Sequence, residues 1–184
     1  MRSNQYYTAE MVRALIREDQ HWPRYEAVHG QLLVTPAPPP MHQEAVVRLV
    51  VALHDFAMRT GAGRVVASPA DVSWGLLDTI VQPDVFVIPA DQSRLHEWKD
   101  LRAISLAIEI VSPASEKSDR VTKRTLYQER GVPLYWIVDI TARQVEVWTP
   151  ADTEPQIERE QVVWHPAGVA DRCTLSLAEL FRDV

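Results

Sequence analysis

Apolar side chains recur at helical spacing in two stretches of the N-terminal third of the chain. Residues 8–18 carry Met11 and Leu15 after a threonine, a residue type that often caps a helix. Residues 41–60 carry a broader apolar stripe, and Gly61 follows it directly. Because positions three and four apart share one face of an α-helix, both stretches predict amphipathic helices. The longer stripe predicts the main helix of the core.

Shorter apolar runs, rich in β-branched residues, predict the strands of a sheet. Residues 25–34 have Gly30 at a turn-like centre and indicate a β-hairpin, which a group of prolines then ends. Residues 81–88 and 104–111 are almost continuously apolar, as expected of strands in the centre of a sheet. The remaining expected strands cover residues 64–67, 71–76, 135–140 and 144–148, with one or two more within 157–164.

Further helices are expected in the C-terminal half. A helix over residues 116–130 is followed by Gly131 and Pro133, which are helix stop signals. Leu177 and Leu180 indicate a short terminal helix. Strands and helices in this order predict an α/β fold in which helices flank a sheet.

Length and composition agree with one globular domain over residues 1–184. The chain has 184 residues, of which 46% are hydrophobic and 24% are charged, and these are ordinary values for a globular protein. No apolar run reaches the roughly 18 residues of a membrane-spanning helix, and the first residues lack the apolar core of a secretory signal. We therefore expect a cytoplasmic protein. Cys173 is the only cysteine, so it is expected to be a buried bystander.

Two carboxylates interrupt the central apolar runs. Asp84 precedes Val85 at the start of one run, and Glu109 lies inside the other. A buried carboxylate is unfavourable without a cation or strong hydrogen-bond donors. If the two strands are neighbours, one divalent cation could satisfy both acids, and their hard oxygen ligands suit Mg²⁺ or Mn²⁺. The alternatives are a salt bridge to a nearby lysine or arginine, or a protonated Glu109.

Pro83-Asp84, then Glu109 in an apolar strand, then a helix with a lysine form an ordered pattern along the chain. This pattern resembles the PD-(D/E)XK nuclease superfamily. More narrowly, the chain resembles the Uma-two family of "putative restriction endonucleases". The stretches that carry the resemblance are residues 25–30, 37–43, 83–85, 109–113, 119–127 and 131–139. The resemblance implies a restriction-endonuclease-like mixed β-sheet core flanked by helices, with an N-terminal β-hairpin and extra C-terminal strands.

The resemblance also implies a metal-dependent endonuclease that hydrolyses DNA phosphodiester bonds. Asp84, Glu109 and the backbone carbonyl of Ile110 would hold Mg²⁺, with Mn²⁺ as an alternative ion. The superfamily pattern places a lysine two residues after the glutamate, where this chain has Val111. Lys123 would then be the migrated catalytic lysine. Its alternative role is an ion pair with the aspartate four residues earlier on the same helix face.

Other residues match family positions near the metal or could contact DNA. Glu26, His42 and Asp119 could form an outer shell that orients water or substrate. Alternatively, Glu26 only flanks a strand and His42 only begins a helix. The helix over residues 116–130 also has basic side chains on the face opposite Lys123. They could contact phosphates, or they could form an ordinary solvated face: Lys117, Arg120 and Arg124.

The net charge leaves a second function open. The chain has 19 Lys and Arg and 25 Asp and Glu, which gives a net charge of −6. This charge disfavours binding of nucleic acid by the whole surface, although one basic face is sufficient for phosphate contacts. The alternative to an endonuclease is therefore a catalytically silent nuclease-fold module for binding or dimerisation, which the missing lysine at Val111 supports. We also expect a homodimer, with Trp148 and Trp164 as candidates for its interface.

Overall fold

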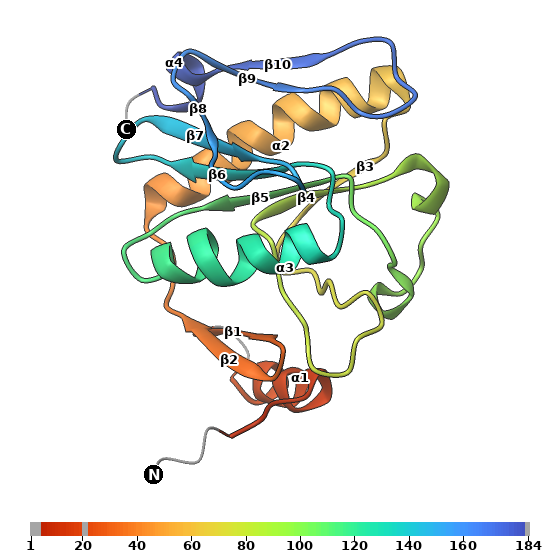
Figure 1. Ribbon diagram of the computed structural model, residues 1–184, viewed down its shortest axis with the longest axis vertical. Helices are drawn as coiled ribbons and strands as arrows, with labels where there is room; N and C mark the ends of the chain where they lie inside the picture. The colour runs from red at the N-terminus through yellow and green to blue at the C-terminus, as the bar shows by residue number, and fades with distance from the viewer. Residues whose placement is uncertain (1–4, 20–21, 183–184) are drawn as a thin grey trace.

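A mixed sheet of six strands runs between two layers of helices (Figure 1). The computed structural model describes residues 5–19 and 22–182. The strand order is β3-β4-β5-β6-β7-β8, and only β5 and β6 are parallel neighbours within it. The bounds of these strands are β3 (Arg64–Ala67), β4 (Val85–Ile88), β5 (Leu106–Ile110), β6 (Tyr135–Asp139), β7 (Gln144–Trp148) and β8 (Gln156–Glu158).

Local sequence signals set the ends of the first two helices. In α1 (Ala9–Glu18), the hydroxyl of Thr8 accepts a hydrogen bond from the backbone N–H of Met11, as an N-cap does. The longer α2 (Pro40–Thr60) begins with a proline in its first turn and ends at Gly61, which has a left-handed φ of 72°. Glycine adopts this conformation without the steric cost that a side chain would add.

Smaller elements surround the main sheet. Two antiparallel hairpins lie outside it, and 3₁₀ turns and a π-helical segment interrupt the connections between strands. These elements are β1 (Arg24–Val28) with β2 (Gln31–Thr35), β9 (Gln161–Trp164) with β10 (Cys173–Ser176), η1 (Ala90–Gln92), η2 (Trp98–Asp100), η3 (Ser118–Lys123), α3 (Arg124–Glu129) and α4 (Leu177–Leu180). No helix among the described residues is long and apolar enough to span a membrane.

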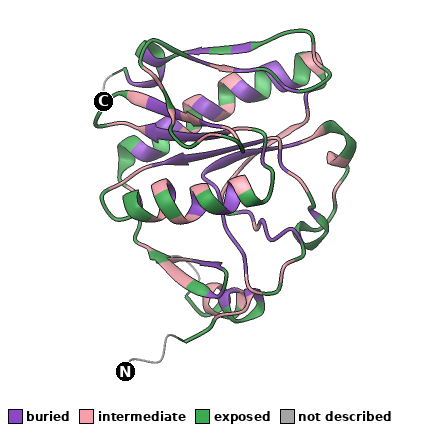
Figure 2. Ribbon diagram, in the orientation of Figure 1, coloured by how far each residue is buried: buried purple, intermediate pink, exposed green. Residues whose placement is uncertain are grey.

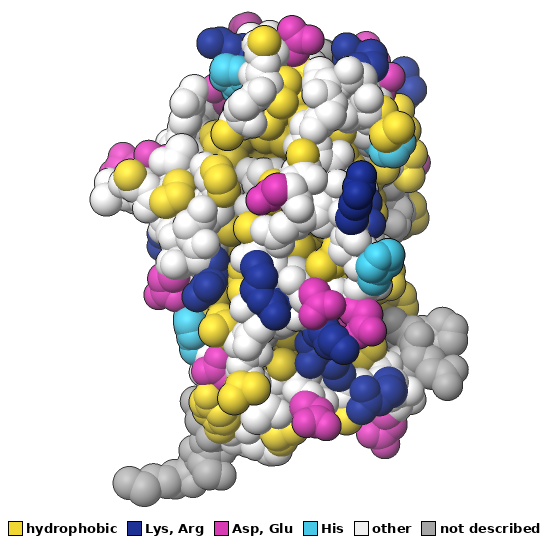
Figure 3. All heavy atoms as spheres, turned by 90° about the vertical axis from the view of Figure 1, so that its right-hand side faces the viewer, with side chains coloured by type: hydrophobic (Ala, Val, Ile, Leu, Met, Phe, Trp, Pro, Cys, Tyr) yellow, Lys and Arg dark blue, Asp and Glu magenta, His cyan; other side chains and the backbone are white. Residues whose placement is uncertain are grey.

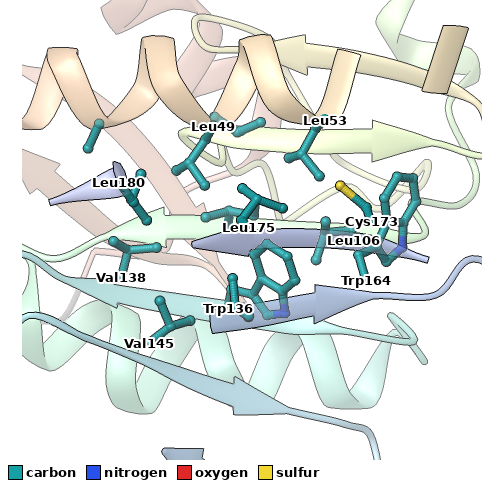
Figure 4. Packing of buried hydrophobic residues seen from close by; sticks show 14 of the residues in the cluster. Leu49, Leu53, Leu106, Trp136, Val138, Val145, Trp164, Cys173, Leu175 and Leu180 are labelled. Carbon is teal, nitrogen blue, oxygen red and sulfur yellow. The ribbon is translucent and has the colours of Figure 1, made fainter. Parts of the chain in front are cut away.

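Side chains of the central strands alternate between two cores. Val85 and Ile108 face the core that contains α2, β9, β10 and α4, and Figure 4 shows part of this packing. Phe86 and Ala107 face the opposite core, which contains α3. Because both faces of the sheet are covered, the central strands are buried along their length (Figure 2). This explains their continuously apolar sequences.

Most of the predicted elements are present, and the mixed sheet with flanking helices, an N-terminal hairpin and extra C-terminal strands is confirmed. The strand expected over residues 71–76 is wrong, because only Val72 forms a bridge there, to Val81. The strand β10 was not predicted. It holds Cys173, which is buried as expected, and burial raises the pKa of its thiol to about 11.

The tryptophans expected at a dimer interface lie inside the chain instead. Trp164 is 2% exposed and packs edge-on against Phe56 of α2. Trp148 is 7% exposed and lies in the other core. Neither indole is available to a partner, because β9 and β7 each direct their alternate apolar side chains into a core of this chain.

Gly63 provides a test of how tightly β3 and β4 pack. A Cβ at this position would lie 2.2 Å from the backbone oxygen of Ile88, whereas a Cβ at Gly61 would meet nothing within 4 Å. Both glycines have positive φ. We expect Gly61→Ala to lower the free energy of unfolding by about 1–2 kcal/mol through strain alone. Gly63→Ala should lower it by a further ~1–3 kcal/mol through the clash. Urea unfolding of both variants measures the difference, and equal losses would contradict the expectation.

Candidate metal and phosphate site

Asp84 and Glu109 face the same side of the sheet. The strands β4 and β5 are neighbours, as the shared-cation hypothesis required, and they pair antiparallel with Val85 opposite Ile108. Continuing that register by one residue places Asp84 opposite Glu109. Side chains alternate along a strand, so both carboxylates project to the face that α3 covers. Both also line one cavity.

Three hydrogen-bond donors hold the carboxylate of Asp84. Arg24 Nη1 lies 2.8 Å from Oδ1, while His42 Nε2 and the backbone N–H of Ile110 lie 3.0 and 2.9 Å from Oδ2. Burial alone would raise the pKa of Asp84. The His42 hydrogen bond, the Arg24 charge and the Ile110 N–H outweigh burial and lower it well below its usual range. Asp84 is therefore an anion fixed in orientation at neutral pH.

Glu109 occupies a less favourable environment. Its Oε1 accepts hydrogen bonds from Lys123 Nζ at 3.0 Å and from the Tyr127 hydroxyl at 2.9 Å. Burial raises the pKa of Glu109 well above its usual value, and the nearby Lys123 charge opposes that shift only in part. Glu109 lies in a strand that is buried on both faces. Its negative charge is therefore unfavourable there unless a cation is close.

Lys123 supplies that cation, and it is shared among three acids. Its Nζ lies 2.9 Å from Glu26 Oε2, 3.0 Å from Glu109 Oε1 and 3.6 Å from Asp119 Oδ1. Burial would lower the pKa of Lys123, but the charges of Glu109, Glu26 and Asp119 raise it above its usual value. The ammonium therefore stays charged at neutral pH. Lys123 therefore forms the ion pair with Asp119 that was the alternative to a catalytic role, and it also contacts Glu109.

A π-helical segment positions the last two of these groups. The segment η3 joins directly to α3 and carries Asp119 and Lys123, both buried. The N–H of Arg124 donates to the carbonyl of Asp119, five residues back, which is the wider turn of a π-helix. The hydroxyl of Tyr135 in β6 donates to the same carbonyl. The Tyr135 hydrogen bond joins this segment to the sheet, and from it Lys123 reaches Glu109 while Asp119 reaches Lys123.

The cavity between these groups is small and polar. Its volume is about 20 Å³, which is room for about one water molecule or one ion. Asp84, Glu109, Asp119 and His42 contribute to its wall. Among the described residues, Asp119 Oδ1 and His42 Nδ1 are buried without a hydrogen-bond partner, and Asp119 Oδ1 has only the longer 3.6 Å contact to Lys123. Buried polar atoms are rarely left unpaired, so these two atoms are suited to a small polar ligand.

The donor set fits a hard divalent cation. Carboxylate oxygens with open positions for water are the ligands that Mg²⁺ and Mn²⁺ prefer. Ile110 lines the same cavity. Within residues 5–19 and 22–182, no three His, Cys, Asp or Glu side chains form a ready-made metal cluster. The carboxylates are instead compensated by Arg24 and Lys123 in this structure.

The basic residues expected to contact phosphates are largely engaged within the chain. Arg120 pairs with Glu116, with Asp139 at 2.6 Å and with Glu146 at 2.7 Å. Arg124 lies 4.9 Å from the ring centroid of Trp148, while Lys117 is exposed. Acids of β6 and β7 already pair with Arg120, so its contact with phosphate stays a prediction. On the molecular face in Figure 3, basic and acidic side chains also lie next to one another.

Two residues of the site had not been assigned to it from the sequence. Arg24 alternates with Glu26 on β1, so the two share a strand face, and this period-two spacing is a signal that could have identified Arg24. Tyr127 is four residues after Lys123 on the same helix, and its hydroxyl reaches Glu109. Glu26, His42 and Asp119, expected as an outer shell, all contact Asp84 or Lys123.

Comparisons with known proteins agree with this fold. A family model named Uma2 and described as "Putative restriction endonuclease" matches residues 8–179. A solved structure described as a "putative nuclease belonging to DUF820" from Anabaena variabilis is similar, with a TM-score of 0.69 and 22% sequence identity over 86% of this chain and 90% of that chain. A search of curated proteins found no match. The structural likeness at this identity concerns the fold.

The shared ammonium predicts opposite effects for two substitutions. Lys123→Met leaves three buried carboxylates without their cation, so we expect it to lower the free energy of unfolding by about 3–5 kcal/mol. Glu109→Gln removes a costly charge, while Lys123 keeps Glu26 and Asp119, so we expect a gain of about 1 kcal/mol, or ~2–4 °C in Tm. Thermal unfolding in EDTA measures both. A large fall in Tm for Glu109→Gln would instead identify Glu109 as a structural residue.

Asp119 predicts how stability depends on pH. Burial is the main reason that its pKa rises from 3.8 to about 6. Between these values the folded protein holds a proton that the unfolded chain releases, so stability rises as pH falls. We expect a gain on the order of 1 kcal/mol from pH ~7 to pH ~5 in EDTA. Asp119→Asn should reduce this gain, whereas the exposed Asp100→Asn should keep it. Equal gains in all three proteins, measured by urea unfolding, would contradict the assignment.

Proposed function

The chain belongs to the Uma2 family, and from that membership we propose that it is a metal-dependent endonuclease that hydrolyses DNA phosphodiester bonds. The observation that carries the proposal is the meeting of Asp84, Glu109 and Lys123 around one small cavity. Three segments far apart in the sequence bring two carboxylates and one ammonium together there. A cluster of four acids and two cations is more typical of a functional site than of a purely structural core.

Asp84, Glu109 and the carbonyl of Ile110 are the proposed ligands of Mg²⁺, or of Mn²⁺ in its place. Such a cation, when bound, lowers the pKa of a coordinated water and polarises the scissile phosphate. His42 and the N–H of Ile110 hold Asp84 Oδ2, so they fix the direction of its other oxygen. Arg24 now contacts that oxygen, and it would exchange this contact for one to the substrate phosphate.

Lys123 is the proposed catalytic cation. A charged donor aimed at the phosphate stabilises the negative charge that develops during hydrolysis. When Glu109 serves as a metal ligand, Glu26 and Asp119 still hold the ammonium at the edge of the cavity. Glu26 is itself held by the backbone N–H of Gln82, at 2.7 Å. These two acids are therefore positioning residues for Lys123.

The remaining proposals concern the setting of this activity. One domain over residues 1–184 is supported by a family match that covers residues 8–179. A cytoplasmic location and a homodimer stay predictions, the latter without Trp148 and Trp164 as its interface. DNA as the substrate is supported by the family description. Lys117 stays a candidate for phosphate contact, because it is exposed on the helix that carries Lys123.

A plasmid-nicking assay tests the proposal. We expect nicking with Mg²⁺ or Mn²⁺, no nicking in EDTA, and loss of nicking in Asp84→Asn. Lys123→Met should lower the rate at least about a hundredfold, the scale of one lost transition-state donor, without weakening Mn²⁺ binding measured by calorimetry. Asp100→Asn and Lys99→Met are the matched exposed controls and should keep at least half of the wild-type rate.

Two outcomes would contradict the proposal. Nicking that persists in Asp84→Asn would place the chemistry elsewhere. A folded wild type that neither binds Mn²⁺ nor nicks DNA would support the silent binding or dimerisation module, which Val111 in place of a lysine also favours. Circular dichroism of each variant separates loss of the site from loss of the fold, because Lys123→Met is also expected to be less stable.

A further inference from the structure

A second and larger groove adjoins the candidate site. Its volume is about 460 Å³, which is within the range of small-molecule pockets. It lies between the C-terminal end of α1, the start of β1, the first turn of α2 and the Ser68-Pro69 segment. Trp22 and Arg24 line both the groove and the small cavity of Asp84 and Glu109. A ligand that fills the groove would therefore lie next to a group bound in the small cavity of Asp84 and Glu109.

Two aromatic rings, two prolines and one isoleucine form the apolar part of the groove wall. These residues are Trp22, Tyr25, Pro23, Pro69 and Ile16. The indole of Trp22 is 42% exposed, although tryptophan is usually highly buried. An exposed aromatic ring beside a polar site is suited to stacking against a flat ligand. The exposed amide of Gln43 lies at the same groove and can both donate and accept hydrogen bonds.

The charges of the groove are already compensated. Asp19 and Arg24 are its charged side chains within the part of the chain that the structure describes. The Tyr25 hydroxyl donates to Asp19 at 2.5 Å, and Arg24 pairs with Asp84. Arg24, whose proposed phosphate contact lies beside Asp84, is the cation that the described part of the groove offers, so a second phosphate inside the groove would have no partner. The groove favours a neutral, flat, partly polar ligand, and a nucleobase has this chemistry.

We propose that this groove binds an unpaired nucleobase of the strand whose phosphate lies at Asp84 and Glu109. This inference rests on the proposed function, and it adds whether the DNA substrate is single-stranded or double-stranded. A base inside a duplex is stacked and paired, so only a single-stranded or locally opened nucleotide can reach such a groove. The preferred substrate is therefore single-stranded DNA, or DNA with an unpaired segment at the scissile phosphate.

Arg24 connects the two halves of the substrate site. Its guanidinium carbon lies 5.8 Å from the ring centroid of Trp22, while its Nη1 contacts Asp84 Oδ1 and the carbonyl of Gln82. Cations are attracted to the face of an indole at this separation. Arg24 thus fixes the indole relative to the carboxylate. The position of the base follows from that of the phosphate, because both contact the same arginine.

Binding in EDTA tests the inference apart from cleavage. Fluorescence anisotropy would compare a labelled single-stranded oligodeoxynucleotide, the same strand as RNA, its duplex, and a strand with abasic positions. We expect Trp22→Ala to weaken single-strand binding about tenfold, in the range of one lost base–aromatic stack, and Trp22→Phe to restore most of the affinity. Duplex binding should be weaker and unaffected. The abasic strand should bind wild type about as weakly as the intact strand binds Trp22→Ala.

Trp98→Ala is the matched control. Trp98 is also exposed, at 37%, but it lies in η2 and packs edge-on against Phe86. It should leave single-strand affinity unchanged. The inference is overturned if Trp22→Ala binds the single strand like wild type, if both tryptophan variants lose affinity equally, or if wild type does not bind the single strand. Wild type that binds the single strand through Trp22 but cleaves neither that strand nor plasmid with Mg²⁺ or Mn²⁺ would overturn the proposed nuclease and keep the base-binding groove.

Discussion

The buried ammonium of Lys123 is the interaction on which the arrangement of the site depends. It lies within 3.6 Å of oxygens from Glu26, Glu109 and Asp119. These acids come from β1, β5 and η3, so one cation joins the N-terminal hairpin, the central sheet and the covering helix. A charge buried in this way is tolerated only when its partners are close and well oriented. The hairpin, the sheet and the helix are therefore held in one mutual placement at the site.

The sheet determines which side of the molecule receives the charges. Alternate residues of β4 and β5 face the two cores, and Asp84 and Glu109 both fall on the face that α3 covers. The opposite face is entirely apolar in these strands and packs against α2, β9 and β10. Separation of the two faces lets one core stabilise the fold while the other accommodates costly charges. The pKa of Asp84 is lowered and that of Glu109 is raised, and strongly shifted pKa values cluster at functional sites.

Each of the two buried carboxylates has its own set of hydrogen-bond donors. Arg24 and His42 hold Asp84, and Lys123 with Tyr127 holds Glu109. Each carboxylate thus keeps its orientation, which reduces the reorganisation required when a ligand binds. The groove beside Trp22 extends the same principle to the substrate, because Arg24 fixes both the carboxylate and the indole.

The sequence by itself determined most of the secondary structure and marked Asp84 and Glu109 as candidate site residues. Apolar periodicity located the central strands, and charges inside apolar runs identified Asp84 and Glu109, because both signals are local. The tertiary structure alone decided which cation serves which acid. Glu26 and Arg24 contact partners about 60 to 97 positions away, and sequence spacing carries no information about such contacts. It also decided that Arg120 is neutralised by Asp139 and Glu146, and that Trp164 is buried. The physical reason is that burial and ion pairing depend on how strands and helices pack, whereas periodicity reports only the face on which a residue lies.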